Sequence, residues 1–184
     1  MRERRKTEKP SFAGSLLLAH PRLRDPNFRR VVVLMSAHNA EGAMGVVLNR
    51  PLSQRLGELS GEFALSPLSG VTMFCGGPVQ PEQLLLVAWQ SREEGFRLHF
   101  GVEPDKACQL LAEGGTEVRA FRGYSGWSGG QLEKELRADT WVVADVPPDL
   151  LTHAPGDGLW RAVLGAQGEE WTLLANEPDD PAVN

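Results

Sequence analysis

The sequence predicts an α+β fold with a mixed, mostly antiparallel sheet flanked by helices. Short apolar and β-branched runs outnumber the helical patterns, and several are joined by short polar turns, as in β-hairpins. The helical patterns come late in the chain instead of alternating with the strands. A regular alternation of strand and helix would predict a parallel α/β sheet, so that class is disfavoured.

The predicted strands follow from their composition. Residues 31–35 are a continuous run of valine, leucine and methionine, which is typical of a central strand. The polar turn at residues 38–42 joins this run to residues 43–48, so the two predict a hairpin. A short buried strand is expected at residues 15–19. Further strands are predicted at residues 71–74, 84–89, 96–100, 118–121 and 141–144.

Helices are predicted where apolar residues recur every three to four positions. Residues 104–113 are the clearest case, because Pro104 suits a first helical turn and Gly114 with Gly115 suits a helix end. The other predicted helical segments are residues 55–63, a helix that starts at about residue 131, a turn at residues 149–151, and residues 158–164.

A glycine-rich stretch at residues 121–136 reads FRGYSGWSGGQLEKEL and is predicted to be a strand end, a loop and a helix start. Its glycines allow backbone conformations that a side chain would forbid. Ser128 and Gln131 have the spacing of a capping box, in which each side chain bonds to the backbone N–H of the other. Tyr124 and Trp127 are large residues in this predicted loop, so we expect them to be exposed.

Length and composition indicate a soluble, cytoplasmic protein. The chain has 184 residues, 23% of them charged, and a net charge of −5, which is ordinary for one globular domain. The acidic balance disfavours direct nucleic-acid binding, since such domains are usually basic. No apolar run approaches the about 20 residues of a membrane span. The apolar run at residues 16–19 is too short for the core of a signal peptide.

We expect residues 1–13 to form a disordered N-terminal arm and residues 14–184 to fold as a single domain. A basic tether to RNA or to a membrane surface is the alternative for the arm, but Glu3 and Glu8 dilute its positive charge. The acidic, proline-broken tail from residue 177 onward is expected to be loosely held.

Four blocks of polar, glycine and proline residues stand out by their order and spacing. They are His20-Pro21 with Asp25-Pro26-Asn27-Phe28; His38-Asn39 with Glu41-Gly42-Ala43-Met44-Gly45 and Asn49-Arg50-Pro51; Gly76-Gly77-Pro78-Val79; and Gly123-Tyr124 with Gly126-Trp127 and Gly130-Gln131-Leu132-Glu133. With these blocks the chain resembles the YqgE/AlgH family of bacterial proteins from about Gly14 onward.

The resemblance implies a compact α+β fold whose sheet is coiled or bifurcated and partly closed like a barrel. It also implies a regulatory role, because one branch of the family is associated with transcriptional regulation without a recognised DNA-binding motif. It supplies neither catalytic residues nor a cofactor, and none is predicted. The family usually has a small residue other than serine at the position of Ser128, and often lacks a cysteine at the position of Cys75.

A small serine hydrolase is the enzymatic alternative. Residues 126–130 read G-x-S-x-G, the pattern of a nucleophile elbow, and Asp145 and His153 follow Ser128 in the order of an α/β-hydrolase triad. However, the chain from Ser128 to His153 is short for three groups on separate sheet edges, and Ser128 is better explained as a helix cap. We therefore predict no catalytic residues, with this hydrolase and a nucleic-acid-binding protein as the alternatives.

The cysteines and histidines show no metal-ligand spacing, so no metal site is predicted. Cys75 is a redox candidate at a strand end, although the sequence shows no neighbouring cation or helix N-terminus to activate its thiol. Cys108 is expected to lie in a helix and to be buried in the core of the protein. His38 and Glu41 could share a turn.

We expect a non-enzymatic protein that acts through an unknown protein partner or a small anionic ligand. Backbone N–H groups of a glycine-rich loop before a helix favour an anion, and loops that converge from different strands can form one concave surface. The candidate binding residues are Asn49, Arg50, Gly76, Gly77, Tyr124, Ser125, Gly126 and Trp127.

Overall fold

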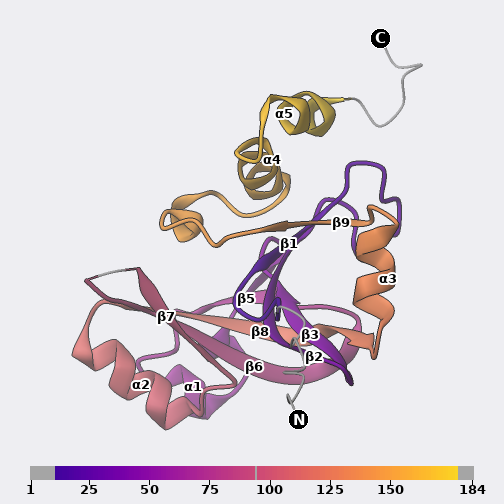
Figure 1. The fold of residues 1–184 in the computed structure, drawn as a ribbon. Helices are drawn as coiled ribbons and strands as arrows, with labels where there is room; N and C mark the ends of the chain where they lie inside the picture. The colour runs from indigo at the N-terminus through magenta and orange to yellow at the C-terminus, as the bar shows by residue number, and fades with distance from the viewer. Residues whose placement is uncertain (1–10, 94, 178–184) are drawn as a thin grey trace, which may run out of the picture.

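The computed structural model describes residues 11–93 and 95–177 (Figure 1). Within these residues, nine strands hydrogen-bond into one sheet. They are β1 (Leu16–Ala19), β2 (Val32–Asn39), β3 (Gly42–Val47), β4 (Pro51–Arg55), β5 (Thr72–Cys75), β6 (Val79–Ser91), β7 (Phe96–Phe100), β8 (Thr116–Ser128) and β9 (Trp141–Ala144).

Short helices complete the described part of the chain. The α-helices are α1 (Gly61–Ala64), α2 (Pro104–Glu113), α3 (Gln131–Arg137), α4 (Asp157–Gly165) and α5 (Glu169–Asn176). Two 3-10 helices are η1 (Leu56–Glu58) and η2 (Leu150–Thr152). Figure 1 shows α4 and α5 beyond β1 and β9, α3 at a second side, and α1 with α2 near β6 and β7.

Strand β8 is the centre of the sheet because it pairs with three other strands. Its first part pairs antiparallel with β6, its middle pairs parallel with β5, and its last four residues pair antiparallel with β3. From β3 the sheet continues through β2 and β1 to β9, while β7 extends the other branch beside β6. This confirms the predicted α+β class with a mixed, mostly antiparallel sheet. The sheet curls without closing into a barrel (Figure 1).

The two branches of the sheet bury three apolar clusters. The largest contains Phe121 of β8 and Trp160 of α4. A second contains Trp127 of β8 and Leu132 of α3. The third lies beneath α2, which contributes Leu110. Because β8 contributes to all three clusters, its position determines where the side chains of both branches lie.

The predicted loop at residues 123–130 is wrong over most of its length. Strand β8 continues through Ser128, because residues 125–128 pair with β3. Helix α3 begins at Gln131, as predicted, but its N-cap is Gly130 and not Ser128. The φ angle of Gly130 is 78°, a conformation that favours glycine.

Other elements agree with the sequence to different degrees. Three match their predicted bounds, residues 96–100, 104–113 and 141–144. The predicted helix at residues 55–63 is instead η1 followed by α1, because Ser60 starts a new helix by accepting a hydrogen bond from the N–H of Phe63. Helix α5 has no counterpart among the predicted elements.

Residues 1–10 of the predicted arm and residues 178–184 of the predicted tail lie outside the described residues. Phe12, at the start of the described part, donates its backbone N–H to Nδ1 of His38 at 3.2 Å. The rings of these two residues lie 4.9 Å apart. In residues 11–93 and 95–177 no helix has both the length and the apolar character to cross a membrane.

Candidate functional site

The glycines among the predicted binding residues lie where two chain segments pack closely. The carbonyl oxygen of Gly76 accepts hydrogen bonds from the N–H of Val47 at 2.9 Å and from the hydroxyl of Ser125 at 3.1 Å. A side chain on Gly76 or Gly77 would collide with backbone atoms of β8. Both glycines and Ser125 are buried. Close packing of the two chain segments therefore accounts for these residues at this junction.

Asn49 and Arg50 hold neighbouring backbone segments in place. Asn49 is buried, and its amide makes three hydrogen bonds. The partners are the N–H of Val32 (2.9 Å) and the carbonyl oxygens of Arg30 (2.8 Å) and Gly156 (2.9 Å). Arg50 donates to the carbonyl oxygen of Arg29 at 2.6 Å. The polar atoms expected to face a ligand are thus bonded to the protein itself.

Trp127 is buried, which corrects the expectation that it is exposed. Its side chain is 6% exposed and packs beside Phe28 and Trp141. Tyr124 is half-buried and Gly126 is exposed. Tyr124, Gly126 and Trp127 nevertheless border one hollow of about 530 Å³ on the surface of β3 and β8. Their role in binding stays a prediction.

One carboxylate holds two of these indoles. Oε2 of Glu135 on α3 accepts the N–H of Trp127 at 2.9 Å and the N–H of Trp141 at 2.7 Å. Its Oε1 accepts a hydrogen bond from the side chain of Gln131 at 2.9 Å. Hydrogen bonds to a charged acceptor are stronger than neutral ones. Glu135 therefore fixes α3 against β8 and β9.

Ser128 and His153 of the hydrolase alternative do not form one site in the structure. Ser128 donates its hydroxyl to Oε1 of Gln131 at 3.2 Å, and its N–H donates to the same oxygen at 3.0 Å. Half of the predicted capping box is thus present, but the Ser128 oxygen caps no backbone N–H of α3. His153 lies 3.4 Å from Asp149 and borders a different hollow, beside β5.

Cys75 is exposed at the end of β5, where the sequence predicts it. Its backbone N–H donates to the carbonyl oxygen of Arg50 at 2.8 Å. Its redox role stays a prediction. Cys108 on α2 is half-buried and packs against the third apolar cluster.

His38 contacts Glu133 and not Glu41. Its Nε2 lies 3.0 Å from Oε1 of Glu133, while its Nδ1 accepts the N–H of Phe12. Because Nδ1 accepts, the proton of the neutral ring lies on Nε2, which donates to the carboxylate. Among the described residues, no group of three or more histidine, cysteine, aspartate or glutamate side chains has an arrangement that could hold a metal ion.

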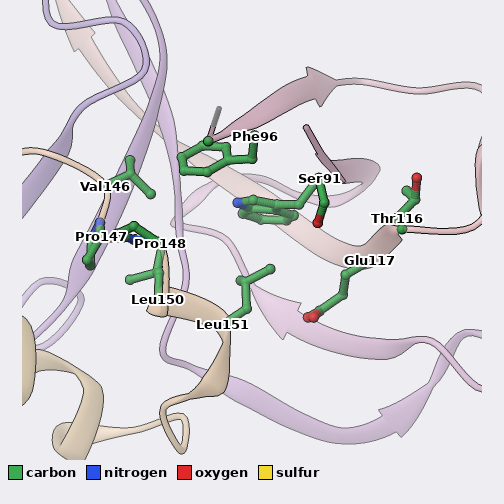
Figure 2. A pocket seen from close by; sticks show the side chains of 12 residues that line it. Ser91, Phe96, Thr116, Glu117, Val146, Pro147, Pro148, Leu150 and Leu151 are labelled. Atoms are coloured by element: carbon green, nitrogen blue, oxygen red, sulfur yellow. The ribbon is translucent and has the colours of Figure 1, made fainter. Parts of the chain in front are cut away.

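A pocket that the sequence did not predict lies between the β6–β7 hairpin and the segment that follows β9 (Figure 2). Its volume of about 410 Å³ is within the usual range for small-molecule sites. We call it the Trp89 pocket. Its larger lining side chains are Trp89, Ser91, Phe96, Thr116, Glu117, Val146, Pro147, Pro148, Leu150 and Leu151.

The Trp89 pocket has an apolar side and a polar side. Figure 2 shows Val146, Pro147 and Pro148 on one side of the pocket, with Thr116 and Glu117 on the other. The apolar side belongs to the chain between β9 and α4, and the polar side belongs to the start of β8. A bound molecule would therefore touch two parts of the fold that are distant in the sequence.

Two buried polar atoms of this pocket have no hydrogen-bond partner among the described residues. They are Nε1 of Trp89, whose side chain is 4% exposed, and Oγ1 of Thr116. The indole N–H groups of three other buried tryptophans, Trp127, Trp141 and Trp160, all donate to oxygen atoms. An unpaired buried N–H costs about 1–3 kcal/mol, and both atoms are buried behind the pocket surface, so a ligand reaches them only if side chains of the wall move.

An ion pair lies beside the unpaired indole. Nε of Arg119 donates to Oε1 of Glu117 at 2.9 Å, and the guanidinium lies 5.8 Å from the ring centre of Trp89. Arg119 thus lies next to both the indole of Trp89 and the carboxylate of Glu117. A second hollow of about 640 Å³ adjoins the pocket, and the two share Thr116, Glu117 and Leu151.

The sequence missed this pocket because its walls come from separate segments and form no local motif. Trp89 ends a predicted strand, and its pocket neighbours lie on β7, β8 and the chain after β9. The available signals were Trp89 itself, since a buried indole needs an acceptor, and the Pro147-Pro148 pair that follows β9. Without the strand pairing, neither signal shows that Trp89 and the two prolines lie beside the same pocket.

The comparisons with known proteins agree with the resemblance seen in the sequence. A family model described as AlgH-like matches residues 16–172. A UPF0301 protein of Streptomyces coelicolor is 39% identical over 190 positions, which cover 97% of this chain and 98% of that protein. A UPF0301 protein of Mycobacterium tuberculosis is 37% identical over 182 positions, covering 94% of this chain and 90% of its own length.

Two solved structures share the fold. A crystal structure of a protein from Corynebacterium diphtheriae has a TM-score of 0.72 at 23% identity and covers 94% of this chain and 95% of its own. The solution structure of the AlgH protein from Pseudomonas aeruginosa has a TM-score of 0.65 at 26% identity. It covers 98% of this chain and 100% of its own. The chain belongs to the YqgE/AlgH family.

Proposed function

We propose that this protein is a non-enzymatic regulatory protein that binds a small ligand in the Trp89 pocket. The observation that carries the proposal is a pocket of about 410 Å³ whose wall contains Trp89, with the unpaired N–H of Trp89 buried behind the surface of that wall. Proteins pair their buried polar groups with few exceptions, and the exceptions call for an explanation. A ligand whose binding moves the side chains of the wall and so completes this hydrogen bond is such an explanation.

The lining of the Trp89 pocket suits binding better than catalysis. Its described side chains include no histidine, lysine or cysteine, which are the usual general bases and nucleophiles beside carboxylates. Ser91 lines the pocket without a histidine beside it. Apolar walls with a few polar atoms are the common composition of a ligand site.

Ligand binding at this place can alter the surface of the protein. The pocket wall formed by Val146 and Leu151 lies in the segment between β9 and α4, and Leu150 in this wall is buried in the largest apolar cluster together with side chains of α4. A ligand that contacts both this wall and β8 stabilises the arrangement in which the two lie together. Ligands shift a conformational equilibrium by such differential contacts. A partner protein that contacts α4 or α5 would then sense the ligand.

A partner surface is proposed at the hollow of Tyr124, Gly126 and Trp127. The specific observation is that three of the predicted binding residues border this one hollow, together with Glu41 and Met44. The half-buried aromatic ring of Tyr124 is the kind of side chain that is enriched at protein interfaces. The acidic charge of the chain still favours a protein partner over nucleic acid.

A thermal-shift screen tests the ligand function and separates the two sites. The library contains nucleotides, phosphorylated metabolites, carboxylates and uncharged heteroaromatic compounds. A ligand at 100 times its dissociation constant adds about 2.7 kcal/mol of stability, which raises the melting temperature by several degrees. We expect stabilising compounds whose effect is lost in Trp89→Phe and kept in Tyr124→Ala.

The reverse pattern would place the ligand at the Tyr124 hollow. Stabilisation that survives Trp89→Phe at full size would contradict the proposed ligand site. A screen without any stabilising compound on the folded protein would contradict small-ligand binding as a whole.

A further inference from the structure

Strand β7 forms an open edge of the sheet. It pairs with β6 on one side and with no other strand of the described chain (Figure 1). Another edge strand, β4, begins with Pro51 and pairs irregularly with β5, and such features protect an edge from further pairing. Strand β7 contains no proline and keeps an unbroken register with β6, so its edge is unprotected.

Alternate residues of β7 turn their backbone groups away from β6. In an antiparallel pair, every second residue bonds to the neighbouring strand, and the residues between them face the other side. The N–H of Arg92 donates to the carbonyl oxygen of Gly95 at 3.1 Å, so Gly95 faces β6. Every second residue from there, Arg97 and His99, also faces β6. The residues that face outward are Phe96, Leu98 and Phe100.

Hydrogen bonds on the two sides of β6 agree with this direction. The N–H of Ser91 donates to the carbonyl oxygen of Gly115 at 2.7 Å on the β8 side, whereas the carbonyl oxygen of Leu86 accepts the N–H of Val102 at 3.0 Å on the β7 side. Within residues 11–93 and 95–177, no hydrogen bond engages the backbone groups of residues 96, 98 and 100. A row of such unpaired groups is a template for another strand.

The side chains of β7 alternate between an apolar face and a cationic face. Residues 96, 98 and 100 are half-buried against the largest apolar cluster. Arg97 and His99 lie on the opposite face, where His99 is the register partner of Ala88 in the third apolar cluster, beneath α2. Arg97 is exposed. A strand added to this edge would therefore meet cations on one face and apolar side chains on the other.

The cationic face gathers more than one positive charge. The guanidinium of Arg92 donates to Oε1 of Gln90 at 2.6 Å, and Nε2 of His99 lies 3.4 Å from the same oxygen. Burial lowers the pKa of His99 below 6.5, and the neighbouring charges of Arg97, Arg92 and Lys106 lower it further. The charges that act on the His99 ring are thus positive, which favours an acidic partner.

An acidic strand suits this edge better than a second copy of β7. If the β7 strands of two copies paired, their cationic faces would lie side by side, and like charges opposite one another destabilise a sheet. The carboxylate of Glu113, which accepts a hydrogen bond from Gln90 at 3.4 Å, offsets only part of the positive charge. Carboxylates on an added strand would instead pair with Arg97.

We infer that the edge of β7 binds an extended, acidic segment of a partner protein as an added strand in which carboxylates alternate with apolar side chains. The carboxylates lie beside Arg97 and His99, and the apolar side chains lie beside Leu98 and Phe100. In this mode of recognition, backbone hydrogen bonds supply affinity and alternate side chains supply specificity. The inference goes beyond the proposed small-ligand function and does not depend on it.

A short, end-capped peptide in which glutamate and valine alternate tests the inference by titration of backbone amide NMR signals. We expect it to bind about tenfold more tightly than a peptide of the same composition whose glutamates are grouped. At about ten times its dissociation constant, the alternating peptide should slow amide hydrogen exchange of Phe96, Leu98 and Phe100 about tenfold. The amides of Arg97 and His99 face β6, so their exchange should change little.

N-methylation of the peptide tests the backbone pairing without changing the protein. Methyl groups on the valine nitrogens remove the N–H groups that an antiparallel added strand turns toward β7, whereas methyl groups on the glutamate nitrogens point away. The first derivative should lose binding and the second should keep it. Parallel addition reverses the two. Equal effects of both derivatives would contradict an added strand.

Two charge reversals test the cationic face. Arg97→Glu changes an exposed side chain and should weaken the alternating glutamate peptide about tenfold. The corresponding peptide with lysine in place of glutamate should bind this variant more tightly than it binds the parent chain. Arg137→Glu is the matched control, because Arg137 is exposed on α3 and the change in net charge is the same. It should leave the affinity unchanged.

Several outcomes would overturn the inference. They are no binding of the alternating peptide, equal binding of the grouped peptide, slowed exchange that does not alternate along β7, and an equal loss of affinity in Arg97→Glu and Arg137→Glu. A dimer of the free protein that protects the amides of Phe96, Leu98 and Phe100 would also overturn it, because it would assign the edge to a second copy of the chain.

Discussion

Trp89 and Thr116 line the same pocket, and neither the buried indole N–H of Trp89 nor the buried hydroxyl of Thr116 has a hydrogen-bond partner among the described residues. The indole N–H groups of three other buried tryptophans are paired. Trp127 and Trp141 share Oε2 of Glu135, and Trp160 donates to the carbonyl oxygen of Ala19 at 2.8 Å. Unsatisfied polar groups are expected at functional sites, where a ligand completes the bonding.

A matched pair of substitutions measures whether the Trp89 N–H is unpaired in solution. Trp89→Phe and Trp160→Phe remove the same atoms from side chains that are 4% and 1% exposed. Only the second leaves a buried carbonyl oxygen without its partner, so Trp160→Phe should cost about 1–3 kcal/mol more unfolding free energy than Trp89→Phe. Urea denaturation of both variants checks this. An equal cost would show that the Trp89 N–H is bonded in the free protein.

Glu135→Ala should destabilise the protein by about 2–4 kcal/mol, because two indole N–H groups lose a charged acceptor. Glu135→Gln is the matched control, since its amide keeps one acceptor oxygen and should retain about half of this contribution. The measurement is the free energy of unfolding in urea, followed by tryptophan fluorescence. A loss below about 0.5 kcal/mol for Glu135→Ala would mean that the carboxylate does not hold α3 in solution.

Gly76→Ala should cost about 3 kcal/mol, because the new methyl group meets the carbonyl oxygen of Gly123 in the packed backbone of β8. Gly70→Ala is the control. A methyl group there meets no atom within 4 Å, so its effect should stay within about 0.5 kcal/mol. Thermal melting compares the two variants. Equal stability of both would show that the β5–β8 junction is looser than described.

His20 should make the protein less stable as the pH falls. Burial lowers the pKa of His20 below 6.5, the nearby charge of Arg22 lowers it further, and Asp139 opposes with a smaller effect. The unfolded chain therefore binds a proton more readily than the folded one, and stability falls as the pH drops through 6.5 toward the folded pKa. In the neutral ring Nδ1 accepts the N–H of Arg22 at 3.1 Å, and protonation removes this bond.

The His20 prediction is checked by titration of its ring protons by NMR and by unfolding at two pH values. His20→Asn keeps an acceptor oxygen and should lose less stability than the parent chain on acidification. Some dependence of stability on pH should remain in this variant, because burial and neighbouring cations also lower the pKa of His99. A folded His20 pKa at or above 6.5 would contradict the prediction.

Local chemistry explains which parts of the fold the sequence predicted. Helix α2 has its proline at the start and its glycines after the end, and strands β7 and β9 are bounded by clear turns. All three keep their predicted bounds. The end of β8 does not, because its glycines suggest a loop until β3 is placed beside it. There, glycine serves the close approach of strands, which composition alone does not reveal.

The candidate residues likewise divide into those that the sequence predicted and those that it did not. The converging segments of Gly76, Ser125 and Asn49 were found by their spacing, but their polar atoms bond to the protein's own backbone. The unpaired Trp89 was not found, because its environment depends on the pairing of β6 with β8 and on the chain after β9. An unsatisfied group is a property of the folded neighbourhood and not of any short motif.

The most direct test of the ligand site is a two-dimensional nitrogen–proton NMR spectrum of the indole N–H groups, recorded with and without the compounds of the thermal-shift library. The account predicts that a stabilising compound moves the Trp89 signal downfield, as a new hydrogen bond requires, while the Trp160 signal stays in place. Stabilising compounds that leave the Trp89 signal unmoved would contradict it.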